Sequence, residues 1–197
     1  MKDLEIKKYK KLNTMAQSEG IVIFGEGPDT SIPLCELRQA LNVDERMYNR
    51  SFSKLSINDA VNIYDECVSP LLPDTIFIHI GESDLDMFKN NHTDFDTKYR
   101  LLINHIRKQN KYCRIAVISI KNPDNNSEIN EMNKHLQYIA DSEKCEFGDV
   151  SVQKIWNPKA TIEAASFIRS IGFVHPLRIP NPLSDLIKAI FCSEVYA

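Results

Sequence analysis

The stretch Gly20-Ile21-Val22-Ile23-Phe24-Gly25-Glu26-Gly27 decides the fold of this chain. Residues 21–24 are all apolar, three of them are β-branched, and a glycine follows directly. A short, continuously apolar run that ends at a turn residue is typical of a strand buried on both faces. Such strands belong to parallel sheets covered by helices on either side, so the rest of the chain should alternate between strands and helices.

The sequence on both sides of this stretch alternates in that way. Further strands are predicted at residues 46–49, 75–80, 114–120 and 146–150. Helical spacing of apolar residues is found at 2–18, 33–41, 56–68, 94–109, 126–142, 160–170 and 182–191. Strands separated by helices form βαβ units. We therefore predict a three-layer α/β/α sandwich around a parallel five-stranded sheet, in a single domain over residues 1–197 that an amphipathic helix (about 2–18) precedes.

Composition narrows the class of protein. The chain has 197 residues, of which 43% are apolar and 26% charged, as expected for one globular domain with a proper core. A net charge of −3 gives no general attraction to nucleic acid or to anionic lipid. No apolar run approaches 18 residues, and the N-terminus does not resemble a signal peptide, so we predict a cytoplasmic protein without a membrane partner.

The cysteines argue against a disulfide framework and against a zinc site. There are five of them, an odd number, widely spaced and without a C-x-x-C pair. They are Cys35, Cys67, Cys113, Cys145 and Cys192. Cys113 and Cys145 lie beside apolar strand residues and are expected to be small core residues. Neither a metal nor a cofactor is predicted.

The predicted architecture also indicates where a ligand should bind. In open parallel sheets ligands bind beyond the carboxyl ends of the strands. The residues that directly follow positions 24, 49, 80 and 150 are therefore the first to inspect.

Four segments in order resemble the sequence blocks of the SGNH (GDSL-type) ester hydrolases. The segments are residues 21–27, 48–54, 73–84 and 172–176. Gly25-Glu26-Gly27 stands where that family has Gly-Asp-Ser, and Gly81-Glu82-Ser83-Asp84 where it has Gly-x-Asn-Asp. Gly172-Phe173-Val174-His175-Pro176 is similar to Asp-Gly-x-His-Pro. The resemblance implies the flavodoxin-like strand order of the SGNH fold.

The residues that carry the family's chemistry are mostly replaced. The resemblance places Gly27 at the nucleophile, Lys54 at the oxyanion-hole glycine and Ser83 at the oxyanion-hole asparagine. It places Gly172 at the aspartate that would orient the base, and His175 is the only one of these positions that is retained. Ester hydrolysis needs a nucleophile, a base and donors aimed at the oxyanion, so ordinary serine-esterase chemistry is not expected.

Two functions follow from this pattern and stay open at the level of sequence. The first is a catalytically degenerate protein, a pseudoenzyme that binds a small acyl- or sugar-bearing ligand or a protein partner. The alternative is a divergent acylhydrolase or lipase-like enzyme with relocated chemistry. There, Ser83 or a water activated by His175 is the nucleophile, and Glu26 or Asp84 steadies the imidazole. Ser83 is equally explained as a residue that fills the space of the lost asparagine.

The remaining polar residues of the edge each have more than one interpretation. Glu26, Glu82 and Asp84 could gather with His175 around a cation, but the spacing matches no metal motif, and Asp84 could instead cap a turn. Lys54 either pairs with Glu26, binds an anionic ligand or faces water.

Three features away from these carboxylates complete the predictions. Trp156 is either a stacking platform in the cleft or a core residue. His79, inside a predicted strand, is expected to be a hydrogen-bonded core residue. The N-terminal helix offers a surface for a protein partner or for a homodimer.

Overall fold

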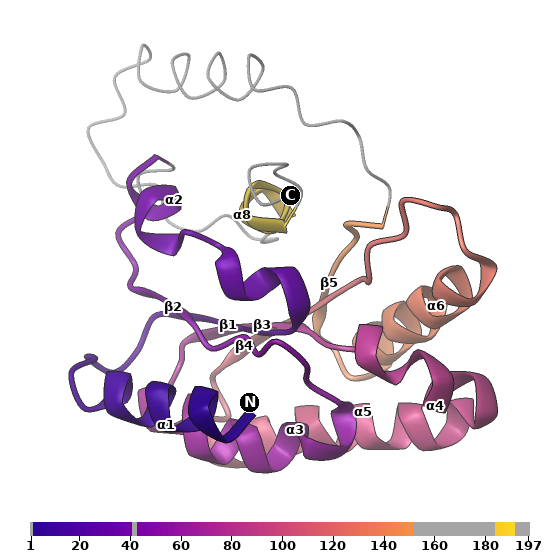
Figure 1. Cartoon of the computed structure of the whole chain (residues 1–197), viewed down its shortest axis with the longest axis horizontal. Helices are drawn as coiled ribbons and strands as arrows, with labels where there is room; N and C mark the ends of the chain where they lie inside the picture. Colours follow the sequence, from indigo (N-terminus) through magenta and orange to yellow (C-terminus); the bar gives the residue numbers. More distant parts are fainter. Residues whose placement is uncertain (1, 41–42, 152–183, 192–197) are drawn as a thin grey trace.

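The computed structural model describes residues 2–40, 43–151 and 184–191, and its centre is a parallel sheet (Figure 1). The five strands lie in the order β2-β1-β3-β4-β5, and every neighbouring pair is parallel. They are β1 (Ile21–Gly25), β2 (Met47–Asn49), β3 (Thr75–His79), β4 (Arg114–Ile118) and β5 (Glu146–Gly148). This confirms the predicted parallel five-stranded sheet and its flavodoxin-like order.

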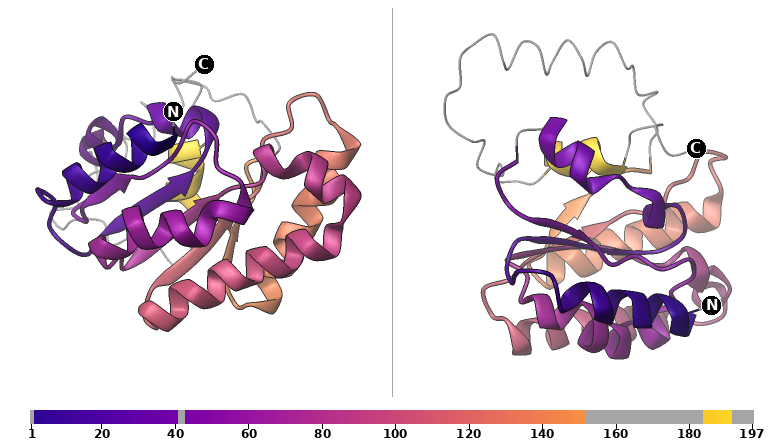
Figure 2. Two further views of the ribbon diagram at one scale, coloured as in Figure 1. Left: turned by 60° about the horizontal axis from the view of Figure 1, so that its bottom comes forward. Right: turned by 60° about the vertical axis from the view of Figure 1, so that its left-hand side comes forward.

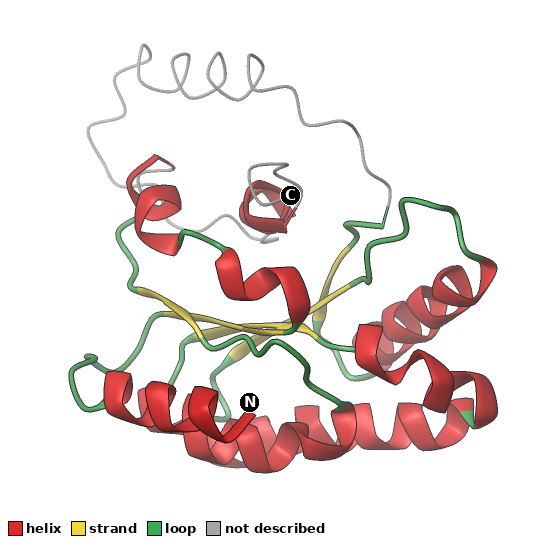
Figure 3. Ribbon diagram, viewed as in Figure 1, coloured by secondary structure: helices red, strands yellow, loops and turns green. Residues whose placement is uncertain are grey.

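Helices cover both faces of the sheet, which gives three layers (Figure 3). One face carries α1 (Lys2–Asn13), α3 (Ile57–Ile63), α4 (Leu85–Asn90), α5 (His92–Gln109) and α6 (Ser127–Ser142). The other face carries α2 (Leu34–Ala40) and α8 (Ser184–Phe191). The predicted α/β/α sandwich is therefore confirmed within the described residues.

The alternation of side chains along β1 explains why both layers are needed. Val22 and Phe24 belong to the core beneath α1, α3, α5 and α6. Ile21 and Ile23 belong to a second core beneath α2 and α8. All four side chains are essentially inaccessible to solvent, so each layer removes one half of the strand from water.

Several element boundaries differ from the predictions. The first helix ends at Asn13 rather than at residue 18. At this point the side-chain amide of Asn13 donates to the Cys67 carbonyl at 2.9 Å, and Met15 N–H donates to the Leu12 carbonyl in a turn. The helix predicted over 56–68 is α-helical only to Ile63 and continues as a π-helical turn, η2 (Tyr64–Val68). Helix α4 was not predicted, and the helix expected at 160–170 lies outside the described residues.

Helix α1, the indigo helix of Figure 2, lies beside the sheet. Polar contacts as well as packing attach it to the sheet edge. The buried Arg50 donates to Asn13 Oδ1 from Nε at 3.0 Å and from Nη2 at 2.8 Å. Its guanidinium lies 5.2 Å from the Tyr9 ring and 5.5 Å from the Tyr48 ring. The Tyr9 hydroxyl donates to the Ser51 carbonyl. The segment that follows β2 is thus fixed by α1, and with it one wall of the carboxyl edge.

Candidate site at the carboxyl edge of the sheet

The carboxyl ends of β1 and β3 lie side by side and bring together three of the regions singled out in the sequence. Gly25 of β1 pairs in register with His79 of β3. Glu26, directly after β1, forms a parallel bridge with Phe52, which prolongs the pairing beyond β2. Glu26 and the turn that begins at Gly81 therefore face each other across the edge of the sheet.

Gly27, at the position that the resemblance assigns to the nucleophile, begins a 3-10 helix, η1 (Gly27–Ser31). Its φ is +60°, a left-handed conformation that favours glycine. Its N–H donates to the Phe52 carbonyl at 2.9 Å, so this amide is used within the protein. A Cβ at this position would lie 3.4 Å from Glu82 Oε2. The position supplies neither a nucleophilic side chain nor a free backbone donor.

Glu26 is buried, with 4% of its surface exposed, and its carboxylate is surrounded by donors. Oε1 accepts from Gly81 N–H at 2.8 Å and from Ser83 N–H at 3.2 Å. Oε2 accepts from the Ser83 hydroxyl and from Leu55 N–H at 3.4 Å. Hydrogen bonds to an ionised acceptor are about twice as strong as neutral ones, so this arrangement compensates for burial of the carboxylate. We call these four donors the Glu26 nest.

The nest fixes the orientation of Ser83. Its backbone N–H and its hydroxyl both point at Glu26, and the residue is half-buried in the 3-10 turn η4 (Glu82–Asp84). A serine that donates to a carboxylate carries a potential base beside it. The partner predicted from the sequence, His175, lies outside the described residues.

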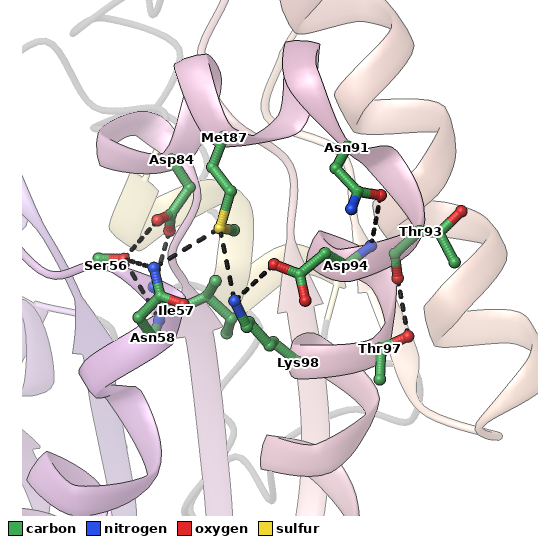
Figure 4. Close-up of polar contacts among 10 residues, drawn as sticks. All are labelled: Ser56, Ile57, Asn58, Asp84, Met87, Asn91, Thr93, Asp94, Thr97 and Lys98. Carbon is green, nitrogen blue, oxygen red and sulfur yellow. Dashed lines mark hydrogen bonds and ion pairs between the residues drawn. The ribbon is translucent and has the colours of Figure 1, made fainter.

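Asp84 caps the start of helix α3 and not, as one interpretation of the sequence had it, the turn that follows Asp84 itself (Figure 4). Its Oδ1 accepts from the Ser56 hydroxyl at 2.5 Å and its Oδ2 from Ile57 N–H at 2.7 Å. Burial raises the pKa of this carboxyl; the two hydrogen bonds oppose the shift, and the nearby charge of Glu26 adds to it. Asp84 ties the β3 turn to α3, and both of its oxygens are engaged in doing so.

Lys54 adds no contact to the described part of the site. The Lys54 side chain is exposed and makes no ion pair among the described residues, while the Glu26 carboxylate is held by the nest. Trp156 lies outside the described residues.

In the part of the chain that the structure covers, no three His, Cys, Asp or Glu side chains are grouped so that they could hold a metal ion.

A buried ion pair beside Gly25 was not predicted. His79 Nδ1 lies 2.6 Å from Asp29 Oδ2, and both residues are buried. Burial acts to lower the pKa of His79, but the charge and hydrogen bond of Asp29 outweigh it and the pKa is raised; Lys121 lowers it and Glu26 raises it further. This confirms that His79 is a hydrogen-bonded core residue. Its partner could not be read from the sequence, since Asp29 follows Pro28 in an ordinary turn.

The thiols of three of the described cysteines are held in their unreactive form by burial. Burial raises the pKa of Cys67 to about 11, of Cys113 to about 12 and of Cys145 to about 11. A thiol with so high a pKa is almost entirely protonated at neutral pH, which makes it a poor nucleophile. These cysteines do not replace the missing serine.

A surface hollow of about 340 Å³ lies between α4 and α6. None of the predicted site residues that belong to the described part of the chain lines it. Its lining residues are Phe88, Lys89, His92, Ser127, Glu128 and Glu131.

Among the described residues no helix is long and apolar enough to cross a membrane.

Comparison with known proteins supports the fold and leaves the chemistry open. No family model and no curated protein matches the chain. Solved structures do match it. A protein described as a candidate platelet activating factor from Streptococcus pneumonia is 18% identical with a TM-score of 0.65, covering 81% of this chain and 78% of that one.

Two further similar structures are described as ester-cleaving enzymes. A GDSL-like lipase from Bacteroides thetaiotaomicron is 16% identical, with a TM-score of 0.59 over 73% of this chain and 77% of its own. The acetyl xylan esterase AlAXEase is 13% identical, with a TM-score of 0.58 over 89% of this chain and all (100%) of its own. The chain therefore has the fold of these hydrolases, as its resemblance to the SGNH blocks predicted.

Proposed function

We propose that this chain, which has the SGNH-hydrolase fold, is a catalytically inactive protein that binds its ligand or partner without hydrolysing it. The ligand that best suits the fold is a small acyl- or sugar-bearing molecule. Structural neighbours named as a GDSL-like lipase and as an acetyl xylan esterase support that choice. The proposal concerns the carboxyl edge of β1 and β3, where such enzymes need their nucleophile and donors.

One observation carries the proposal: the donors at this edge are bonded to acceptors inside the protein. Gly27 N–H donates to Phe52, and both donors of Ser83 donate to Glu26. A hole that stabilises an oxyanion needs donors aimed at the empty position where charge develops. Here a buried carboxylate already holds that charge. Losing one such donor costs on the order of 10²–10³ in rate, and the nucleophile is absent as well.

A second candidate function rests on the contact between Ser83 and Glu26. A serine hydroxyl bonded to a buried carboxylate is a pair from which a relocated nucleophile could be built. It is less well supported, because Glu26 accepts from three further N–H groups and because the hydroxyl is held in a half-buried turn. This alternative makes the opposite prediction about activity.

Hydrolysis of p-nitrophenyl acetate separates the two functions. We expect the protein and its His175→Ala and Ser83→Ala variants to hydrolyse the ester at the same background rate. A relocated active site predicts instead that each substitution lowers the rate by about 10² or more, which is the usual contribution of a general base. Circular dichroism of each variant shows whether a lost rate merely reflects unfolding. A rate that falls in both folded variants would overturn the proposal.

Restoring the serine should not restore the activity. Gly27→Ser places a side chain at φ +60°, which should cost roughly 1 kcal/mol in the free energy of unfolding, and leaves the N–H bonded to Phe52. We expect no esterase rate above that of Gly27→Ala, which carries the same strain without a hydroxyl. Urea unfolding measures the cost. A gain of about tenfold or more over Gly27→Ala would mean that the nucleophile is the one missing part.

Binding without turnover is the positive side of the proposal. Acetylated xylan fragments are titrated into the protein and followed by proton NMR, which reports ligand broadening and free acetate in one spectrum. We expect broadening of the acetylated fragments, weaker broadening of deacetylated ones, and no growth of the acetate signal. Release of acetate at a rate above the buffer control contradicts the proposal directly.

A further inference from the structure

The turn after β3 is shaped to present backbone donors to one carboxylate. Gly81 has φ +147°, a conformation that side chains rarely adopt, and a Cβ there would lie 3.2 Å from Met132 Sδ. This glycine allows the chain to turn so that the N–H groups of Gly81 and Ser83 both reach Glu26. Backbone N–H groups that converge in a turn form a concavity that binds anions.

The carboxylates beside the nest are in different situations. Glu82, the intervening residue of the turn, is exposed and has no hydrogen bond or ion pair among the described residues. Asp84 is buried but bonds to Ser56 and Ile57 of another element. The donors of Gly81 and Ser83 are therefore directed at Glu26 alone.

We infer that the nest formed by Gly81, Ser83 and Leu55 is a carboxylate-binding site that the protein occupies with its own Glu26. In this view Glu26 is an internal ligand that closes the edge, and a small external carboxylate enters only when that side chain is removed or swings out. The inference deepens the proposed function and rests on it, since both require Glu26 to hold the donors at this edge. It adds the class of molecule that the nest accepts once Glu26 has left it: a small monocarboxylate.

Removing the end of the Glu26 side chain should open the site to acetate. Glu26→Ala deletes a methylene and a carboxylate, and together these have the size of an acetate ion. Four donors are then left without their acceptor, and an added acetate can satisfy them. Binding to the folded state raises the midpoint of thermal unfolding by mass action.

The test compares that midpoint in sodium chloride and in sodium acetate at equal ionic strength. At about 0.2 M salt we expect acetate to raise the midpoint of Glu26→Ala by about 3 °C or more. The wild type should not respond, because Glu26 fills the nest. Glu26→Gln should not respond either, because its amide occupies the same space. Glu82→Ala, which removes the exposed neighbouring carboxylate, is the matched control and should behave as the wild type.

An equal response in Glu26→Ala and Glu26→Gln, or none in Glu26→Ala, overturns the inference. If Glu26→Ala does not fold in chloride, the same comparison is made on its refolding yield, where a higher yield in acetate supports the site and equal yields refute it. The outcome is independent of the hydrolysis assay. Acetate can bind Glu26→Ala even if the wild type proves to be an esterase, and an inactive wild type does not by itself establish the nest.

Discussion

Asp29→Ala is expected to lower the free energy of unfolding by about 3–5 kcal/mol, the usual cost of breaking a buried ion pair by removing one partner. Asp29 is the carboxylate that holds His79 at 2.6 Å, and only 10% of the His79 side chain and 3% of the Asp29 side chain are exposed. Without Asp29, His79 must either stay charged without a partner or lose its proton. Urea unfolding of the two proteins measures the loss.

The loss should depend on pH in a defined direction. The pKa of His79 is raised in the folded protein: burial acts to lower it, and Asp29 more than offsets burial. A raised pKa means that the protonated pair stabilises the fold fully below the unfolded value of about 6.5, and that this contribution is lost as pH rises through the folded value. The difference between wild type and Asp29→Ala should therefore be largest near pH 6 and smaller near pH 9.

A surface pair of the same two residue types is the matched control. Asp65 Oδ1 lies 2.7 Å from His105 Nε2, but 43% of the Asp65 side chain and 30% of the His105 side chain are exposed. Asp65→Ala should cost less than about 1 kcal/mol at any of these pH values, because water screens the pair. Equal losses for the buried and the exposed pair would contradict the account of Asp29.

Gly25→Ala should destabilise the protein by about 3 kcal/mol, because the new methyl group would push Asp29 away from His79. A Cβ on Gly25 would lie only 2.2 Å from Asp29 Oδ2 and 3.3 Å from the His79 carbonyl oxygen. Asp29 cannot simply retreat, since its own carbonyl accepts from Asn49 at 2.7 Å. Thermal or urea unfolding of the single variant measures the cost.

A double-mutant cycle tests the cause. In the Asp29→Ala background the carboxylate is gone, so Gly25→Ala should cost less than about 1 kcal/mol there, a coupling of about 2 kcal/mol between two sites in contact. In the Glu82→Ala background its cost should be unchanged. Additive effects of Gly25→Ala and Asp29→Ala would show that the methyl group clashes with something other than the carboxylate.

Local pattern was sufficient to predict most of the fold. The apolar runs at residues 21–24 and 76–78 are typical of strands covered on both faces, and both lie in interior strands of the sheet. The short α4 was missed, because its six residues, Leu85–Asn90, are too few to show a helical period. The π-helical turn after Ile63 has no sequence signature of that kind either.

The site was only partly accessible to sequence reasoning. The sequence alone shows that Gly27 cannot be a nucleophile and that Glu26 stands at the strand end. It does not show where a flexible glutamate side chain points, because its partners, Gly81 and Ser83, are far along the chain. The pairing of His79 with Asp29 depends in the same way on a contact between β3 and η1 that no local spacing encodes.

The strand order has a consequence for how the protein folds. The first strand to be synthesised, β1, lies between β2 and β3 in the sheet. Its edge toward β3 stays unpaired until Ile21 pairs with Thr75. Every pairing in the sheet is parallel, so no two strands can pair early as a hairpin. Each strand pairs only after the long connection between it and its neighbour has crossed over the sheet. Glu26 and Gly81 extend from the ends of these two strands, so the nest can assemble only after that closure. Up to that point in synthesis and folding, Glu26 remains an ordinary solvated glutamate.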